Sequence, residues 1–181
     1  MKLYHSTSPH KVQGGLSSLS VFIPEYIHVF SYMALQPQIP PENPMFVLVS
    51  SRKAVVWLVH ESSLSSRLRN IPFYVVGEAS RRILSENNFK IQGFVPNGIR
   101  NLLARLPMKG GWFIGAKHPV QYTQNWIEGS STIHIACYEQ VPQPITMMNF
   151  DEGAVYLLTS PNIIRRYYEM GMEQSSQIVV L

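Results

Sequence analysis

The chain has 181 residues, of which 45% are hydrophobic and 14% charged, so it can build one large domain or two small ones and does not have a disordered composition. No apolar run approaches the roughly 20 residues that span a membrane, and the N-terminal stretch MKLYHSTSPHKV lacks the apolar core of a secretory signal. The single cysteine, Cys137, excludes an internal disulfide and a cysteine-rich zinc site. We therefore predict a reduced protein of the cytoplasm.

The formal net charge is +4, and the basic residues are scattered along the chain. None of them form the kind of block that marks nucleic-acid-binding tails, so we predict no nucleic-acid partner. A modest positive bias would still attract a small polyanion through long-range steering. The alternative is ordinary solubilising surface charge.

Short apolar runs alternate with helical patterns along most of the chain. The predicted strands span residues 45–51, 72–77, 89–95, 111–116, 131–140, 154–160 and 177–181, with a possible strand at 2–8. The predicted helices span residues 52–64, 78–88, 97–106 with Asn97 as N-cap, 119–129 and 161–171. Residues 21–30 fit neither pattern clearly. The alternation predicts an α/β architecture with parallel sheets.

Two proline-rich segments bracket the central part of the chain. They are PQIPPENP at residues 37–44 and VPQP at residues 141–144. Two such segments, with a strand and helix pattern resuming after the second, suggest one domain inserted into another. We predict a first α/β domain made of residues 1–36 plus 145–181, and an inserted second α/β domain at 37–144 with hinge segments at its ends.

One pattern occurs twice, at a constant offset of 109 residues. MFVLVSSRKAV and AVYLLTSPNII each place two hydroxyl residues where a strand gives way to a helix, Ser50 and Ser51 in the first and Thr159 and Ser160 in the second. The simplest explanation of each is a helix N-cap. The alternative is an anion site, because strand ends and helix N-termini in parallel sheets suit carboxylates and phosphates. We expect the two pairs to face one another across a ligand, one pair from each domain.

Most catalytic signatures are absent from the sequence. It contains no phosphate-binding P-loop, no G-x-G-x-x-G after a strand and no G-x-S-x-G elbow. The six histidines lack metal-ligand spacing, and the only close pair among the eleven carboxylates is Asp151 with Glu152 in a predicted loop. We predict no cofactor and no metal, and expect chemistry that relies on shape and a few proton donors.

Tyr138 is the most promising proton donor, since it lies near the end of the strand at 131–140, just before the second proline-rich segment. The alternative is a boundary tyrosine with its hydroxyl in water. We expect Cys137 to alternate to the opposite face of the strand and to be a buried, small apolar residue. We expect His134, a lone strand histidine, to be packed or surface-exposed instead of catalytic.

The order of these motifs resembles the uroporphyrinogen-III synthase family, cofactor-free cyclases of tetrapyrrole biosynthesis. LVSSRKAV is similar to the family's first T-S-x-x-A-V stretch, and VVGEAS to its V-G-x-x-T turn, with Ser80 in place of threonine. ACYEQVP is similar to its V-Y-x-x-x-P segment and LLTSPNII to its second F-T-S-P stretch. Where the family often carries R-G, this chain has IGAKHP, in which Lys117 supplies charge nearby. The resemblance implies two parallel-sheet α/β domains joined by a two-stranded hinge, with the second domain inserted into the first.

The resemblance also implies an activity. The substrate would be hydroxymethylbilane, a linear tetrapyrrole with many carboxylates, which loses water and closes to uroporphyrinogen III with its terminal pyrrole ring inverted. Tyr138 would donate a proton to the departing hydroxyl, and backbone N–H groups at residues 51–53, 77–79 and 160–162 would bind carboxylates. The substrate-binding residues would be Ser50, Ser51, Arg52, Gly77, Glu78, Ala79, Ser80, Lys117, Thr159, Ser160, Pro161 and Asn162.

The implied protein is a monomer that takes a tetrapyrrole substrate, with transient handover from hydroxymethylbilane synthase. Two other functions stay open from the sequence. One is a non-catalytic two-domain binder of a small polyanion or tetrapyrrole, and the other is a degenerate paralogue with a structural role.

Overall fold

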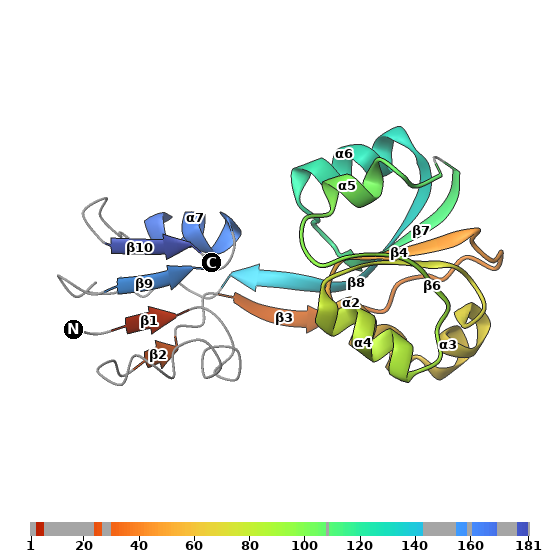
Figure 1. Cartoon of the computed structure of the whole chain (residues 1–181), viewed down its shortest axis with the longest axis horizontal. Helices are drawn as coiled ribbons and strands as arrows, with labels where there is room; N and C mark the ends of the chain where they lie inside the picture. Colours follow the sequence, from red (N-terminus) through yellow and green to blue (C-terminus); the bar gives the residue numbers. More distant parts are fainter. Residues whose placement is uncertain are drawn as a thin grey trace. The chain divides into compact units, whose positions relative to one another are not determined.

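A computed structural model describes residues 3–5, 24–26, 30–107, 109–142, 155–158, 161–169 and 177–180. The chain forms two compact units (Figure 1). One unit consists of residues 1–31 and 141–181, and the other of residues 32–140. The domain boundaries expected from the proline-rich segments lie a few residues away from these positions, and that expectation stays a prediction.

The discontinuous unit contains a four-stranded sheet in the order β10-β9-β1-β2. Its strands are β1 (Leu3–His5), β2 (Pro24–Tyr26), β9 (Val155–Leu158) and β10 (Gln177–Val180), and the helix α7 (Pro161–Glu169) follows β9. All three strand pairs are parallel. Pro161 occupies the first position of α7, where the missing N–H of proline removes no helical hydrogen bond.

The continuous unit is built on a six-stranded sheet in the order β3-β8-β7-β4-β5-β6. Its strands are β3 (Phe30–Ala34), β4 (Phe46–Val49), β5 (Phe73–Val76), β6 (Ile91–Val95), β7 (Lys109–Ala116) and β8 (Ser131–Pro142). The five strands from β8 to β6 are parallel neighbours. Strand β4 lies between β7 and β5, and all four of its residues are buried.

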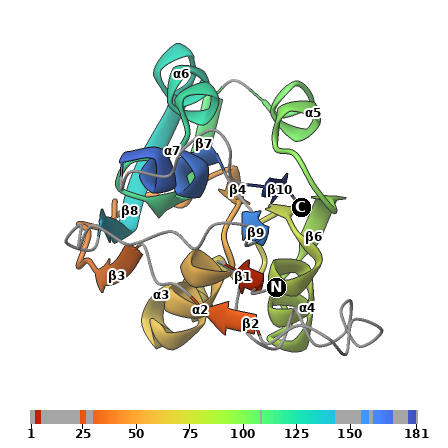
Figure 2. The same ribbon diagram turned by 90° about the vertical axis from the view of Figure 1, so that its left-hand side faces the viewer.

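Helices cover both faces of this sheet, as Figures 1 and 2 show. The helices are α2 (Arg52–His60), α3 (Ser62–Leu68), α4 (Glu78–Glu86), α5 (Arg100–Leu103) and α6 (Gln121–Gly129). Core residues of α2, α3 and α4 pack with Val47 and Val49 of β4, whereas those of α5 and α6 pack with Phe46 and Leu48. Alternation along a strand thus assigns neighbouring residues to two separate cores.

The sheet is mixed, which corrects the expectation of purely parallel sheets. Strands β3 and β8 run in opposite directions (Figure 1). The Ser31 hydroxyl donates to the Val141 carbonyl oxygen at 3.5 Å, and the Leu35 N–H donates to the Cys137 carbonyl oxygen at 3.0 Å. Residue numbers therefore rise along β3 as they fall along β8, which is the pairing of antiparallel strands. The division between the two units falls within these strands, at 31/32 and 140/141.

Two helix predictions are wrong in detail. The helix expected at 52–64 is two helices separated at Glu61, where the Ser65 hydroxyl donates to the Leu58 carbonyl oxygen at 2.6 Å and so satisfies a carbonyl at the end of α2. The helix expected at 97–106 is helical only at Arg100–Leu103, and its N-cap is Ile99 instead of Asn97. Gly98, at φ +70°, intervenes between Asn97 and the helix.

Candidate functional site

The site residues predicted in the central part of the chain gather at one edge of the six-stranded sheet. Ser50 and Ser51 follow β4, Gly77 follows β5, and Lys117 follows β7. Tyr138 pairs with Ala116 at the end of β7. Because parallel strands end at the same edge of their sheet, this is the carboxyl edge at which ligands bind in open α/β sheets.

Ser51 connects two parts of this edge. It is the N-cap of α2, and its hydroxyl oxygen accepts a hydrogen bond from the Lys53 N–H at 3.2 Å. The simple capping explanation is therefore confirmed for this serine. The same oxygen also binds the Tyr138 hydroxyl at 3.0 Å, across 87 residues of sequence. A cap alone would not need this second bond.

A strand irregularity sets the direction of Tyr138. The register between β7 and β8 shifts so that Gly115 pairs with Ala136 and Ala116 with Tyr138, leaving Cys137 as an extra residue. Tyr138 therefore packs against the same core as Cys137, and the predicted alternation to opposite faces is wrong. Such bulges re-aim side chains, often beside functional sites.

The phenol of Tyr138 is half-buried, with an aromatic and a cationic neighbour. The Tyr32 ring lies 6.0 Å from the Tyr138 ring between centroids, and the Lys53 ammonium lies 3.2 Å above the Tyr32 ring. Burial raises the pKa of Tyr138, and its hydrogen bond with Ser51 lowers that pKa by a smaller amount. The phenol therefore stays protonated at neutral pH, as a proton donor must.

Lys53 was missed by the sequence reasoning, which singled out Lys117 instead. The Lys117 ammonium pairs with the Glu139 carboxylate at 3.1 Å, so much of its charge is neutralised. Lys53 and Arg52 open α2, a helix with no acidic residue in its first turn, and positive charge is unfavourable at that end of a helix. Burial and the neighbouring Arg52 charge both lower the pKa of Lys53. The sequence did contain a signal for Lys53: the first turn of the helix, RKAV, has no acidic residue to balance its two positive charges.

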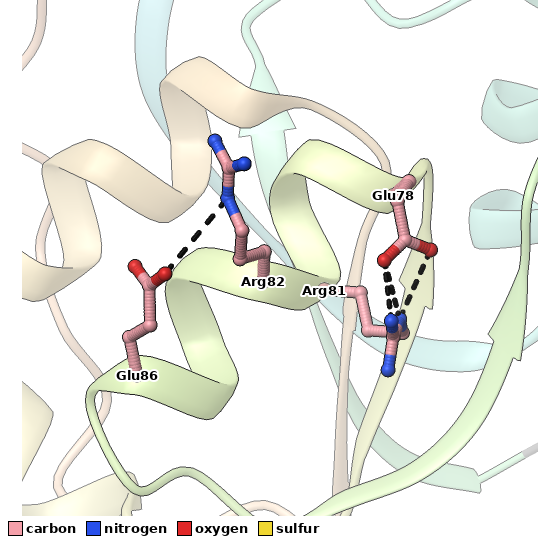
Figure 3. A network of polar contacts seen from close by, with 4 residues as sticks. All are labelled: Glu78, Arg81, Arg82 and Glu86. Carbon is pink, nitrogen blue, oxygen red and sulfur yellow. Dashed lines mark hydrogen bonds and ion pairs between the residues drawn. The ribbon is translucent and has the colours of Figure 1, made fainter.

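The second predicted turn, VVGEAS, opens α4. Gly77 is the N-cap at φ +89°, a conformation that favours glycine. Its N–H already donates to the Val95 carbonyl oxygen at 2.9 Å. Glu78 forms an ion pair with Arg81, and Arg82 forms another with Glu86 at 3.9 Å (Figure 3).

Several of the groups predicted to bind substrate at the starts of α2 and α4 already have partners within the protein. The N–H groups of Gly77 and Lys53 already donate within the protein, to the Val95 carbonyl oxygen and to the Ser51 hydroxyl oxygen, and carboxylate binding by them stays a prediction. The Glu78 carboxylate is exposed and engaged by Arg81, which also lowers its pKa. Ala79 is partly buried and Ser80 is buried in the first turn of α4. Substrate binding by these residues stays a prediction.

The remaining predicted site residues belong to the discontinuous unit. Pro161 and Asn162 open α7, as the sequence predicts. Thr159 and Ser160 lie outside the described residues. The expectation that they face Ser50 and Ser51 across a ligand therefore stays a prediction.

His134 and Cys137 have packing roles, as expected. The His134 ring binds the Ala116 carbonyl oxygen through Nε2 at 2.9 Å and lies against Phe113, and burial lowers its pKa. Cys137 is fully buried in the core, where its thiol donates to the Gly115 carbonyl oxygen at 3.4 Å.

Cys137 should make the fold sensitive to alkali. Burial raises the pKa of its thiol from 9.0 to about 12. A raised pKa in the folded state gives stability that is complete below the unfolded pKa and is lost as the pH rises through 9 towards 12. Between pH 7 and pH 10 we expect this group to remove about 1.4 kcal/mol from the free energy of unfolding. Urea unfolding at both pH values should show that the wild type loses about 1.4 kcal/mol more stability than Cys137→Ala between pH 7 and pH 10. Equal losses in the two proteins would contradict this prediction.

Within the described residues, no group of three or more metal-ligating side chains lies together. The described helices include none that is long and apolar enough to cross a membrane.

Comparison with solved structures shows the fold. No protein-family model and no curated protein sequence matches the chain. The structure is similar to uroporphyrinogen-III synthetase from Helicobacter pylori 26695, with a TM-score of 0.66 and 16% identity over 99% of this chain and 82% of the other. It is also similar to a mutant uroporphyrinogen III synthase from the extremely thermophilic bacterium Thermus thermophilus, with a TM-score of 0.70 and 14% identity over 99% of this chain and 83% of the other. The chain thus has the uroporphyrinogen III synthase fold.

Proposed function

We propose that this protein cyclises hydroxymethylbilane to uroporphyrinogen III with inversion of the terminal pyrrole ring. The observation that carries the proposal is the half-buried, protonated phenol of Tyr138, bonded to Ser51 at the carboxyl edge of the sheet. The proposal is also supported by the fold, which is similar to that of uroporphyrinogen III synthases. The reaction would need no cofactor.

Tyr138 acts as the general acid in this proposal. The bond between the terminal methylene carbon and its hydroxyl breaks, the electron pair leaves with the oxygen, and the Tyr138 proton converts that oxygen to water. The cationic azafulvene that forms is attacked by the substituted carbon of the last pyrrole, and the spiro intermediate rearranges. A proton lost from the closing ring restores the phenol, so the protein is unchanged after each turnover.

Charge at the same edge supports a polyanionic substrate. Arg52 and Lys53 place two cations beside Ser51, and no ion pair within the described residues neutralises either of them. A substrate carboxylate there would relieve the unfavourable placement of positive charge at the start of α2. The protein's further task is orientation, since water alone lets the chain close without ring inversion. The monomeric state, the cytoplasmic location and handover from hydroxymethylbilane synthase stay predictions.

The test is the product isomer. Freshly prepared hydroxymethylbilane is incubated with the purified protein, oxidised, and separated into isomers I and III by chromatography. We expect isomer III to dominate at a rate above that of spontaneous closure. Isomer I alone, at the spontaneous rate, would eliminate the enzyme. Titration with uroporphyrinogen III, kept under anaerobic conditions to prevent its oxidation, would then distinguish a non-catalytic tetrapyrrole binder from a paralogue with a structural role.

A further inference from the structure

We propose that Ser51 is a positioning residue for Tyr138: it holds the phenol oxygen at the carboxyl edge and turns its own O–H towards the phenolate once the proton has been transferred. This inference rests on the proposed function, in which Tyr138 is the acid. It assigns to Ser51 a role distinct from substrate binding and from helix capping.

The hydrogen-bond inventory of a serine hydroxyl permits both states. It has one O–H donor and two acceptor lone pairs, and the hydrogen rotates freely about the Cβ–Oγ bond. In the resting protein, Ser51 Oγ accepts from the Lys53 N–H at 3.2 Å and from the Tyr138 O–H at 3.0 Å. Both lone pairs are then engaged, and the serine hydrogen is left to point elsewhere.

Proton transfer reverses one of these bonds. The Tyr138 O–H first turns from Ser51 to the departing hydroxyl of the substrate. This O–H bond then breaks, its proton goes to that hydroxyl, and the electron pair stays on the phenolate oxygen. Ser51 rotates its hydrogen into the same 3.0 Å contact and donates to that oxygen. The Lys53 N–H bond keeps Oγ in place meanwhile, so no heavy atom needs to move. A preorganised donor of this kind stabilises charge that develops in the transition state.

The backbone is arranged to form the contact between the two side chains. The shift in register at Ala116 makes room for one extra residue in β8 and brings Tyr138 to the side of the sheet on which α2 packs. Without it, simple alternation would point Tyr138 away from Cys137, and so away from that core. The bulge weakens the pairing of β7 with β8 and allows the hydrogen bond between Tyr138 and Ser51. Because it gives up strand pairing for a contact at the sheet edge, we infer that it has a functional origin.

The other titratable groups near the phenol do not replace Ser51. Cys137 on the same strand and Tyr32 on β3 both raise the Tyr138 pKa, whereas the bond with Ser51 lowers it. Lys53, from α2, lies over the Tyr32 ring. Ser51 is thus the neighbour whose hydrogen bond favours the ionised phenol.

The first experiment needs no substrate. Tyrosine labelled with ¹³C at Cζ is incorporated, and the Tyr138 signal is assigned by its loss in Tyr138→Phe. The pKa of Tyr138 should be higher in Ser51→Gly than in the wild type, and Ser51→Thr should restore it. Glycine is chosen because it is a tolerated N-cap that costs only a few tenths of a kcal/mol relative to serine. An unchanged pKa in Ser51→Gly would overturn the inference.

The second experiment is a double-mutant cycle in the cyclase assay. A hydrogen bond to a charged group corresponds to about 10-fold or more in rate, so Ser51→Gly should lower kcat by about that factor and Ser51→Thr should recover most of it. In the Tyr138→Phe background, Ser51→Gly should add almost nothing, since the phenolate no longer forms. Equal slowing in both backgrounds would overturn the role. If the wild type forms only isomer I, the proposed function fails, and the NMR titration still decides the Ser51 bond.

Discussion

Tyr138→Phe should slow the formation of uroporphyrinogen III by about 10² to 10⁴, the usual contribution of a general acid, without abolishing it. The variant keeps the ring and its contact with Tyr32, and loses only the hydroxyl that binds Ser51. Substrate orientation and electrostatics should persist, so residual activity and a preference for isomer III are expected. Initial rates at saturating hydroxymethylbilane, with isomer ratios from the same samples, measure both effects.

Tyr122→Phe is the matched control, because this tyrosine is 41% exposed on α6, on the face of the sheet opposite α2. It should keep the wild-type rate. Wild-type activity in Tyr138→Phe would refute the acid role. An equal loss in both variants would indicate a general effect of tyrosine replacement instead.

The pH dependence of the rate should follow the same phenol. A general acid works only while protonated, and burial moves the Tyr138 pKa above its usual value of 10.0. The rate should therefore not fall on the alkaline side until the pH exceeds the ordinary tyrosine range.

The sequence predicted the central sheet well because its strands carry strong local signals. FVLV in β4 and FYVV in β5 are apolar runs bounded by residues typical of turns and caps, and parallel strands buried on both faces look like this. The N-cap role of Ser51 was also readable, since capping depends on residues two or three positions away.

What the sequence missed depends on contacts between distant residues. Strand β3, FSYMA, is mostly exposed and is defined by its pairing with β8, about a hundred residues away. The bulge that aims Tyr138 involves only a one-residue shift against β7, which no local pattern in ACYEQ reveals. The neutralisation of Lys117 by Glu139 likewise needs the parallel pairing of β7 and β8. Lys53 was the exception, since its unfavourable position was visible locally.

The two-sided burial of β4 leads to the largest expected effect on stability. Leu48 is fully buried and packs with Phe113 and the helices α5 and α6, whereas its neighbour Val49 packs on the opposite core. Leu48→Ala should therefore lower the free energy of unfolding by about 2 to 5 kcal/mol, because the sheet holds the surrounding backbone and the cavity cannot collapse. Leu48→Met nearly conserves volume and should cost less than about 1.5 kcal/mol, and Val56→Ala, on the exposed face of α2, should cost about 0.5 kcal/mol or less. Urea unfolding of the three variants tests this order. A loss below about 1 kcal/mol for Leu48→Ala would mean that β4 is not the centre of two cores. The sheet edge that carries Ser51 would then lack the rigid support that the bond between Ser51 and Tyr138 requires.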